Sequence, residues 1–356
     1  MNTLNYIGSK KTLKDTIFQI CKDNITNIEE LSFADLFAGT GTMGFNVNIT
    51  ENFFKNVISN DLEYYSFIIN YALLKVPYTL KLKEIIQKLN DIEDLVEGLI
   101  YKNFSNHENC ERMFFTNFNA KKCDTIRIEL NKMLELEEIT KDEFIFLLAT
   151  LITSIDKYAN TSSVYGAYLK KYKKSAEKKL ELKAIHTSHI VKEGNEVYNK
   201  KMENLVNEKE FDVVYLDPPY NHRQYGGNYS PLNYIAKYDE NIELTGKTGL
   251  MKGYNKSDFC SKTKMKAIFE KMIKDVKCKY LLLSYNNEGI IEEKDLKEIL
   301  IKKGDLKLFK IKYNKFKAQK SVKIKHTIEY VWFINVKESN EEVPNKYEEI
   351  ELELVK

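Results

Sequence analysis

Several features that mark common protein classes are missing from this sequence. Its five cysteines show no C-x-x-C spacing, so neither a disulfide framework nor a zinc site of that kind is expected. His186 and His189 lie close together, but no second pair of ligands accompanies them. There is no run of 18 apolar residues, and the start, MNTLNYIGSKK, is not a signal peptide. The sequence therefore predicts a cytoplasmic protein without a metal site or a membrane span.

An excess of one charge is also missing, because 55 Lys and Arg against 52 Asp and Glu leave a net charge of +3. The distribution is uneven, with seven lysines in residues 165–183, eight in residues 307–325, and an acidic stretch from Glu338 onward. Lysines mixed with tyrosine and phenylalanine suit a nucleic-acid backbone, which needs neutralised phosphates and stacking rings. A solvated helix face is an equal alternative for 165–183. The alternation of lysines with apolar residues in 307–325 favours binding along a sheet edge or hairpin.

The most informative stretch begins at Phe211. Apolar residues Phe211–Leu216 predict a strand buried on both faces of a parallel sheet, which places Asp217 at its carboxyl end, where α/β sheets bind ligands. Pro218 and Pro219 stiffen the chain and leave carbonyls free, and Tyr220 adds an aromatic plane. This set suits a planar substrate with an exocyclic amine, such as a nucleobase flipped out of a duplex. An ordinary Asp-Pro-Pro turn is the alternative for these four residues alone.

A second pattern predicts a nucleotide-like cofactor. Leu31–Phe37 reads as a strand that opens into the glycine-rich residues 38–44 before a helical segment. Glycines at such a turn let the backbone approach a ligand, and the helix N-terminus offers free N–H groups. The short strand Asn56–Asn60 then ends at Asp61, an acid suited to ribose hydroxyls. The alternative for Asp61 is an N-cap of a helix over Leu62–Lys75.

The middle and the end of the chain add other elements. Helical periodicity predicts three helices in the middle, over Leu80–Ile100, Phe118–Leu136 and Lys141–Tyr158. The connection Tyr238–Met265, with its glycines and lysines, is expected to be a mobile loop that closes over DNA. Three more strands are expected near the end, the last two forming a hairpin, over Lys279–Ser284, Phe309–Tyr313 and Ile324–Val336.

Taken together, NYIGSK, DLFAGTG, the acid after the second strand and DPPYNHRQY resemble the D12 class of adenine-specific DNA methyltransferases, in the motif order of its α group. The residues after the tetrapeptide are similar to the branch that contains type IIS modification enzymes. The resemblance implies an α/β fold of the Rossmann-like class I S-adenosylmethionine-dependent methyltransferases. This fold has a mostly parallel sheet with an antiparallel last strand, here with a helical DNA-recognition insertion.

The resemblance also implies roles for individual residues. S-adenosyl-L-methionine would be bound by Tyr6, Gly8, Lys10, Asp35, Phe37, Gly39, Gly41 and Asp61. The catalytic tetrapeptide would be Asp217, Pro218, Pro219 and Tyr220. We divide the chain into a first catalytic part with the cofactor motifs (1–79), a target-recognition insertion (80–189), a second catalytic part (190–337) and an acidic tail (338–356).

The expected partner is double-stranded DNA, with a cognate restriction endonuclease as a candidate second partner. The residues expected to contact DNA are Lys170, Lys171, Lys173, Lys174, Arg223, Tyr225, Lys315, Lys317 and Lys320. Three other functions stay open at this stage. One is a methyltransferase for an exocyclic amine of RNA or of cytosine, and another is a DNA-binding protein that has lost catalysis on the same fold. The third is a nicotinamide dehydrogenase, because Gly39, Gly41 and Gly44 fit G-x-G-x-x-G.

Overall fold

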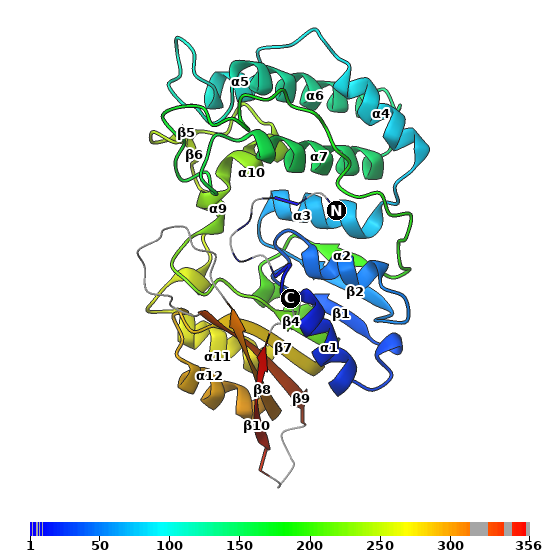
Figure 1. Cartoon of the computed structure of the whole chain (residues 1–356), viewed down its shortest axis with the longest axis vertical. Coiled ribbons are helices and arrows are strands. Elements are labelled where there is room, and N and C mark those ends of the chain that lie inside the picture. Colours follow the sequence, from blue (N-terminus) through cyan, green and yellow to red (C-terminus); the bar gives the residue numbers. More distant parts are fainter. Residues whose placement is uncertain are drawn as a thin grey trace.

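The computed structural model describes residues 1, 3–4, 6, 8, 10–313, 327–337 and 344–353. Its main strands are β1 (Ser32–Asp35), β2 (Asn56–Asn60), β3 (Glu196–Tyr198), β4 (Phe211–Leu216), β7 (Cys278–Asn286), β8 (Gly304–Tyr313), β9 (Thr327–Val336) and β10 (Tyr347–Glu353). They form one eight-stranded sheet in the order β3-β2-β1-β4-β7-β9-β8-β10 (Figure 1). A separate pair consists of β5 (Leu244–Thr245) and β6 (Leu250–Met251).

The sheet is mostly parallel, as expected. Strands β3, β2, β1, β4 and β7 pair in parallel, whereas β9 runs antiparallel to both β7 and β8. The expected hairpin is thus β8 and β9, and the antiparallel strand lies inside the sheet. Together with the family match reported below, this arrangement confirms the Rossmann-like fold class.

The acidic stretch contains a strand that its composition did not predict. Strand β10 pairs in parallel with β8 and extends the sheet by one strand. Its Glu349 lies 2.7 Å from Lys310 of β8, and its Glu348 lies 3.6 Å from Lys307. The first two lysines of the basic stretch 307–325 are therefore paired with acids of the same sheet. The alternation of lysines with apolar residues there serves strand pairing.

Helices cover both faces of the sheet (Figure 1). One face carries α1 (Lys14–Asn24), α2 (Thr42–Ile49) and α3 (Tyr64–Lys75). The other carries α8 (Met202–Glu208), α11 (Met265–Asp275) and α12 (Glu293–Leu300). In β4, Val213 and Tyr215 pack toward the first layer, and Val214 and Leu216 toward the second. The strand is apolar at successive positions because both of its faces are buried.

The middle of the chain forms a helical layer beside α3, made of α4 (Leu80–Asn90), α5 (Leu99–Phe104), α6 (Asn117–Glu135) and α7 (Lys141–Ile155) (Figure 1). The prediction of one helix over Leu80–Ile100 was wrong, because residues 91–98 are not helical. There Asp124 of α6 accepts hydrogen bonds from the backbone N–H groups of Gly98, Ile100 and Tyr101, and so starts α5 separately. Among the described helices, none is both long and apolar enough to cross a bilayer.

Two arginines join this layer to the rest of the molecule. Arg127 of α6 donates to the Ile235 and Ala236 carbonyls at the end of α10 (Ser230–Lys237). Arg112 donates through its three nitrogens to the carbonyls of Asn103, Gly246 and Lys247. The turn between β5 and β6 is therefore held against the helical layer in this structure. Closure of the connection Tyr238–Met265 over DNA stays a prediction.

Candidate active site

The site lies where the chain reverses direction across the sheet, between β1 and β4. These two strands are neighbours in the sheet, with Asp35 opposite Tyr215, but the chain continues from β1 toward β2 and from β4 toward β7. A crevice opens at the carboxyl ends of strands at such a point, because the two connections leave in opposite directions. The glycine loop after β1 and Asp217 after β4 therefore face the same space, as the sequence predicts.

The glycine loop is held in place by side chains from α3 and from the end of β2. Asp61 accepts a hydrogen bond of 2.7 Å from the Gly39 backbone N–H, and Ser66 and Asn70 both donate to the Gly39 carbonyl. At Gly41 φ is +71°, and a Cβ there would lie 2.7 Å from a Leu73 methyl carbon. Only glycine fits this position, for both its backbone angle and its space.

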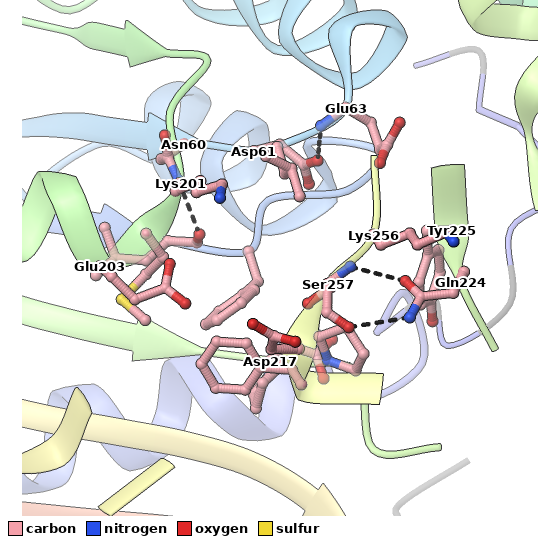
Figure 2. A pocket seen from close by; sticks show the side chains of 18 of the residues that line it. Asn60, Asp61, Glu63, Lys201, Glu203, Asp217, Gln224, Tyr225, Lys256 and Ser257 are labelled. Atoms are coloured by element: carbon pink, nitrogen blue, oxygen red, sulfur yellow. Dashed lines mark hydrogen bonds between the residues drawn. The ribbon is translucent and has the colours of Figure 1, made fainter. Parts of the chain in front are cut away.

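Asp61 does not cap a helix over Leu62–Lys75, because α3 begins at Tyr64, two residues after the expected start at Leu62. Its carboxylate instead accepts from the N–H groups of Gly39 and Glu63, with the second hydrogen bond drawn in Figure 2. Burial raises the pKa of Asp61, and the hydrogen bonds from these N–H groups oppose that shift. Asp61 therefore holds the glycine loop and the start of α3 at the same time.

Tyrosine rings bring the N-terminal segment to the glycine loop. The Tyr6 ring stacks on Tyr229 at 5.0 Å between centroids and lies 5.4 Å from Tyr225. A Cβ at Gly39 would lie only 3.0 Å from the Tyr6 ring, so glycine also permits this close packing. Tyr225, predicted from the sequence to contact DNA, thus lies in the cavity beside Tyr6 and Asp217. The chain from Tyr225 onward forms a short helix, α9 (Tyr225–Asn228), which carries Tyr225 inward.

Asp217 forms an ion pair with Lys10, whose Nζ lies 2.7 Å from Asp217 Oδ1 and 3.2 Å from the Gly8 carbonyl. The Lys10 side chain is 7% exposed and that of Asp217 is 19% exposed. Burial raises the pKa of Asp217, and the Lys10 ammonium opposes the rise. Burial also disfavours the Lys10 ammonium, but the charges of Asp217 and Glu329 outweigh this effect and raise its pKa. Lys10 was predicted to bind the cofactor, and the structure shows its ammonium paired with Asp217, the predicted catalytic carboxylate.

Two adjoining cavities share Tyr6, Gly8, Phe37 and Asp217. The larger is also lined by Asp61 and by the rest of the tetrapeptide, and the smaller by Lys10, Asp35 and Gly39. Gly41 is the N-cap residue of α2, at the point where the glycine loop ends and the helix begins. The structure thus brings together the predicted catalytic and cofactor residues.

The larger cavity also has walls that no sequence motif indicated. Figure 2 shows Asp61 and Asp217 on opposite sides of the space, with Lys201 and Glu203 toward one end. The other end is closed by two hydrogen bonds, from Ser257 N–H to Gln224 Oε1 and from Gln224 Nε2 to the Ser257 carbonyl. Gln224 belongs to the DPPYNHRQY stretch, and Ser257 lies in the connection Tyr238–Met265. Lys201 and Glu203 come from the connection between β3 and β4, where no motif indicated a site.

Glu63 is a further buried acid at this cavity that the sequence did not indicate. It is 4% exposed, and its Oε2 accepts a 2.6 Å hydrogen bond from Asn233 of α10. Burial raises the pKa of Glu63 to about 7, although the Asn233 hydrogen bond favours the ionised form. Its protonation state therefore changes near neutral pH.

The predicted DNA-contacting residues lie in different surroundings. Lys170, Lys171 and Lys174 are exposed on an irregular segment, so the helix-face alternative for 165–183 was wrong. Lys173 is half-buried, and its ammonium donates to the Thr161 carbonyl. Arg223 is exposed next to the cavity wall. Three other predicted lysines lie outside the described residues, namely Lys315, Lys317 and Lys320.

Comparison with known proteins decides the family. Residues 6–299 match the D12 class N6 adenine-specific DNA methyltransferases. The chain belongs to this family. Its resemblance to the D12 class is thereby confirmed, and the protein is an adenine-specific DNA methyltransferase. The dehydrogenase, the RNA or cytosine enzyme and the protein without catalysis are set aside. Methyl transfer in such a family implies S-adenosylmethionine as the general methyl donor.

Three relatives show how much of the chain is shared. The methyltransferase is 40% identical to the type II methyltransferase M.NlaIII of Neisseria lactamica, over 92% of this chain and 98% of that protein. It is 38% identical to the type II methyltransferase M.CviAII of Paramecium bursaria Chlorella virus 1, over 95% and 100%. It is 35% identical to the type II methyltransferase M.FokI of Planomicrobium okeanokoites, over 93% of this chain but 52% of that one.

Proposed function

We propose that this methyltransferase transfers a methyl group from S-adenosylmethionine to the N6 amino group of an adenine that has been flipped out of double-stranded DNA. The observation that carries this proposal is the position of Asp217 at the end of β4, in a cavity that adjoins the glycine loop. A base inside a duplex cannot reach a carboxylate that is 19% exposed, so the base must leave the stack.

The residues around the smaller cavity fit the methyl donor. Asp35 is 2% exposed, and in the part of the chain that the structure describes its Oδ1 has no hydrogen-bond partner. Burial raises the pKa of Asp35 well above its usual range, as do the charges of Asp217 and Asp61. A buried, unpaired carboxyl oxygen beside the glycine loop suits the ammonium group of the donor's methionyl part. Asp61, at the end of β2 and in the wall of the larger cavity, would hold the ribose hydroxyls.

The donor supplies an electrophilic methyl group when it is bound. The chain's own residues then orient the target amine. Asp217 and the Pro218 carbonyl accept hydrogen bonds from its two N–H groups, which draws the nitrogen toward tetrahedral geometry and stabilises the charge that develops on it. Tyr220 stacks on the base. Its backbone carbonyl accepts a 3.0 Å hydrogen bond from Ile290 N–H, and its ring meets Tyr285 edge-on at 6.3 Å.

We propose that the helical layer, residues 80–189, is the target-recognition part and that the duplex is contacted on its side of the molecule. The exposed Lys170, Lys171 and Lys174 lie on one irregular segment that can follow a phosphate backbone. Arg223 follows the tetrapeptide closely enough to contact DNA around the flipped base. Because the relatives are type II methyltransferases, we propose that the enzyme protects DNA in a restriction-modification system with a cognate endonuclease.

The test is transfer of labelled methyl from S-adenosylmethionine to unmethylated DNA, followed by nucleoside analysis. We expect N6-methyladenine with the intact protein and none with Asp217→Ala, while binding of S-adenosylmethionine is retained in both. Asp94→Ala, which removes an exposed carboxylate far from the motifs in sequence, is the matched control and should stay active. Substantial turnover by Asp217→Ala would refute the role of Asp217, and transfer to RNA but not to DNA would refute the substrate.

A further inference from the structure

The Lys10 ammonium lies where the amine of a target base is expected to lie. Its Nζ donates to Asp217 Oδ1 at 2.7 Å and lies over the Tyr220 ring, 6.0 Å from the ring centroid. A flipped base would donate to the same carboxylate while its ring covers Tyr220. The two cannot fully occupy this space together, because an ammonium and a base would compete for one carboxylate and one ring face.

A second carboxylate near Lys10 has no role in the proposed reaction so far. Glu329 of β9 lies opposite Asn286 of β7 in the antiparallel register. The charge of Glu329, like that of Asp217, raises the pKa of Lys10. Burial raises the pKa of Glu329, and the Lys10 ammonium opposes that rise. The Lys10 ammonium contacts Asp217 in this structure, and the charge of Glu329 acts on it as well.

Asn286 connects Glu329 to the stacking tyrosine. It is 5% exposed, and its Oδ1 accepts a hydrogen bond from Glu288 N–H at 3.1 Å. Its amide N–H₂ is thus the group available to donate, and hydrogen bonding from Asn286 lowers the pKa of both Glu329 and the Tyr220 hydroxyl. Asn286 therefore links Glu329 to the Tyr220 ring, and the pairing of β7 with β9 fixes the backbone positions of Asn286 and Glu329.

We propose that the Lys10 ammonium occupies the place of the target amine in the free enzyme. When the base enters, the Lys10 ammonium leaves Asp217 and pairs with Glu329. In the free enzyme Lys10 neutralises Asp217. In the base-bound enzyme Lys10 pairs with Glu329, and Asp217 accepts a hydrogen bond from the amine. Each state contains the same two carboxylates and the same ammonium, so the change does not alter the number of buried charges or their sum. The inference rests on the proposed flipping of the base. It makes Glu329 a positioning residue that acts through Lys10.

The first test is a double-mutant cycle on the single-turnover rate of methyl transfer, with the intact enzyme, Glu329→Gln, Lys10→Met and the double variant. With Lys10 present, Glu329→Gln should slow transfer about tenfold, whereas in the Lys10→Met background it should change the rate by less than about twofold. Glu292→Gln removes an exposed acid at the end of the same connection, just before α12, and is the matched control. Equal losses from Glu329→Gln in both backgrounds would overturn the proposal.

The second test follows insertion of the base and does not need turnover. A duplex with 2-aminopurine at the target position should brighten when the intact enzyme binds, because the base leaves the stack and fills the space over Tyr220. At saturating protein, Lys10→Met should raise this signal and Glu329→Gln should lower it. Changes of the same sign would overturn this role of Lys10. No brightening with the intact enzyme would instead refute base flipping, so the two failures are distinguishable.

Discussion

Replacing Lys10 with methionine should move the acid limb of the pH profile of methyl transfer to higher pH. Methionine keeps an unbranched apolar stem and removes the charge that lies 2.7 Å from Asp217 Oδ1. The proposed reaction needs ionised Asp217 as the hydrogen-bond acceptor for the target amine. Activity is therefore present above the pKa of this carboxyl and is lost as the pH falls through it. Burial raises that pKa and Lys10 opposes the rise. Without Lys10 the pKa rises further, and activity is lost at a higher pH.

The size of the shift follows from the distance between the charges. At 2.7 Å, Coulomb's law with an effective dielectric constant of about 20 gives roughly 6 kcal/mol. Measured shifts caused by an opposite charge are smaller, about 1–3 pKa units. Because the charge of Glu329 also acts on Lys10, we expect a shift of the Asp217 pKa at the lower end of this range. We expect the acid limb to rise by at least about one unit, which is about tenfold in kcat/KM at a fixed pH on that limb.

The assay is kcat/KM for DNA between about pH 5 and about pH 9, because this parameter reports the free enzyme, in which Lys10 contacts Asp217. Lys10→Arg keeps the charge and should keep the profile of the intact enzyme. Glu63→Gln separates the contribution of Glu63, a further acid at the cavity, whose pKa is about 7. An acid limb at the same pH in Lys10→Met and in the intact enzyme would refute the reasoning. A limb that vanishes in Glu63→Gln would belong to Glu63.

Further predictions concern the ring, the fold and the DNA surface. Tyr220→Phe should retain most of the methyl-transfer rate and Tyr220→Ala should lose it, because stacking needs the ring; equal damage by both would contradict stacking. Asp124→Ala leaves three N–H groups of the chain at α5 without their acceptor and should lower the free energy of unfolding by about 3 kcal/mol or more, measured by urea denaturation. Replacing Lys170, Lys171 and Lys174 with alanine should weaken DNA binding and reduce the magnitude of its salt slope by up to about three, and an unchanged slope would place the phosphate contacts elsewhere.

Sequence reasoning succeeded where a short stretch has a strong local consequence. A run of apolar residues interrupted only by Asp212 predicted β4 with its observed bounds, and the residue after it, Asp217, had to lie at the sheet's carboxyl edge. The helix over Leu80–Ile100 failed because periodicity does not show that a buried carboxylate elsewhere, Asp124, takes the N–H groups that begin α5. The strand β10 was missed because its acids look like a solvated tail until the lysines of β8 are set beside them.

The sequence by itself determined the α/β class, the motif order of an adenine methyltransferase and the residues proposed to carry its chemistry, because each depends on neighbours within a few positions. The tertiary structure alone decided which charges meet. Lys10 and Asp217 are 207 residues apart, and Glu329 reaches the same place through the pairing of β9 with β7. Such contacts depend on strand order and register, which arise from packing of the whole sheet, and no local pattern encodes them.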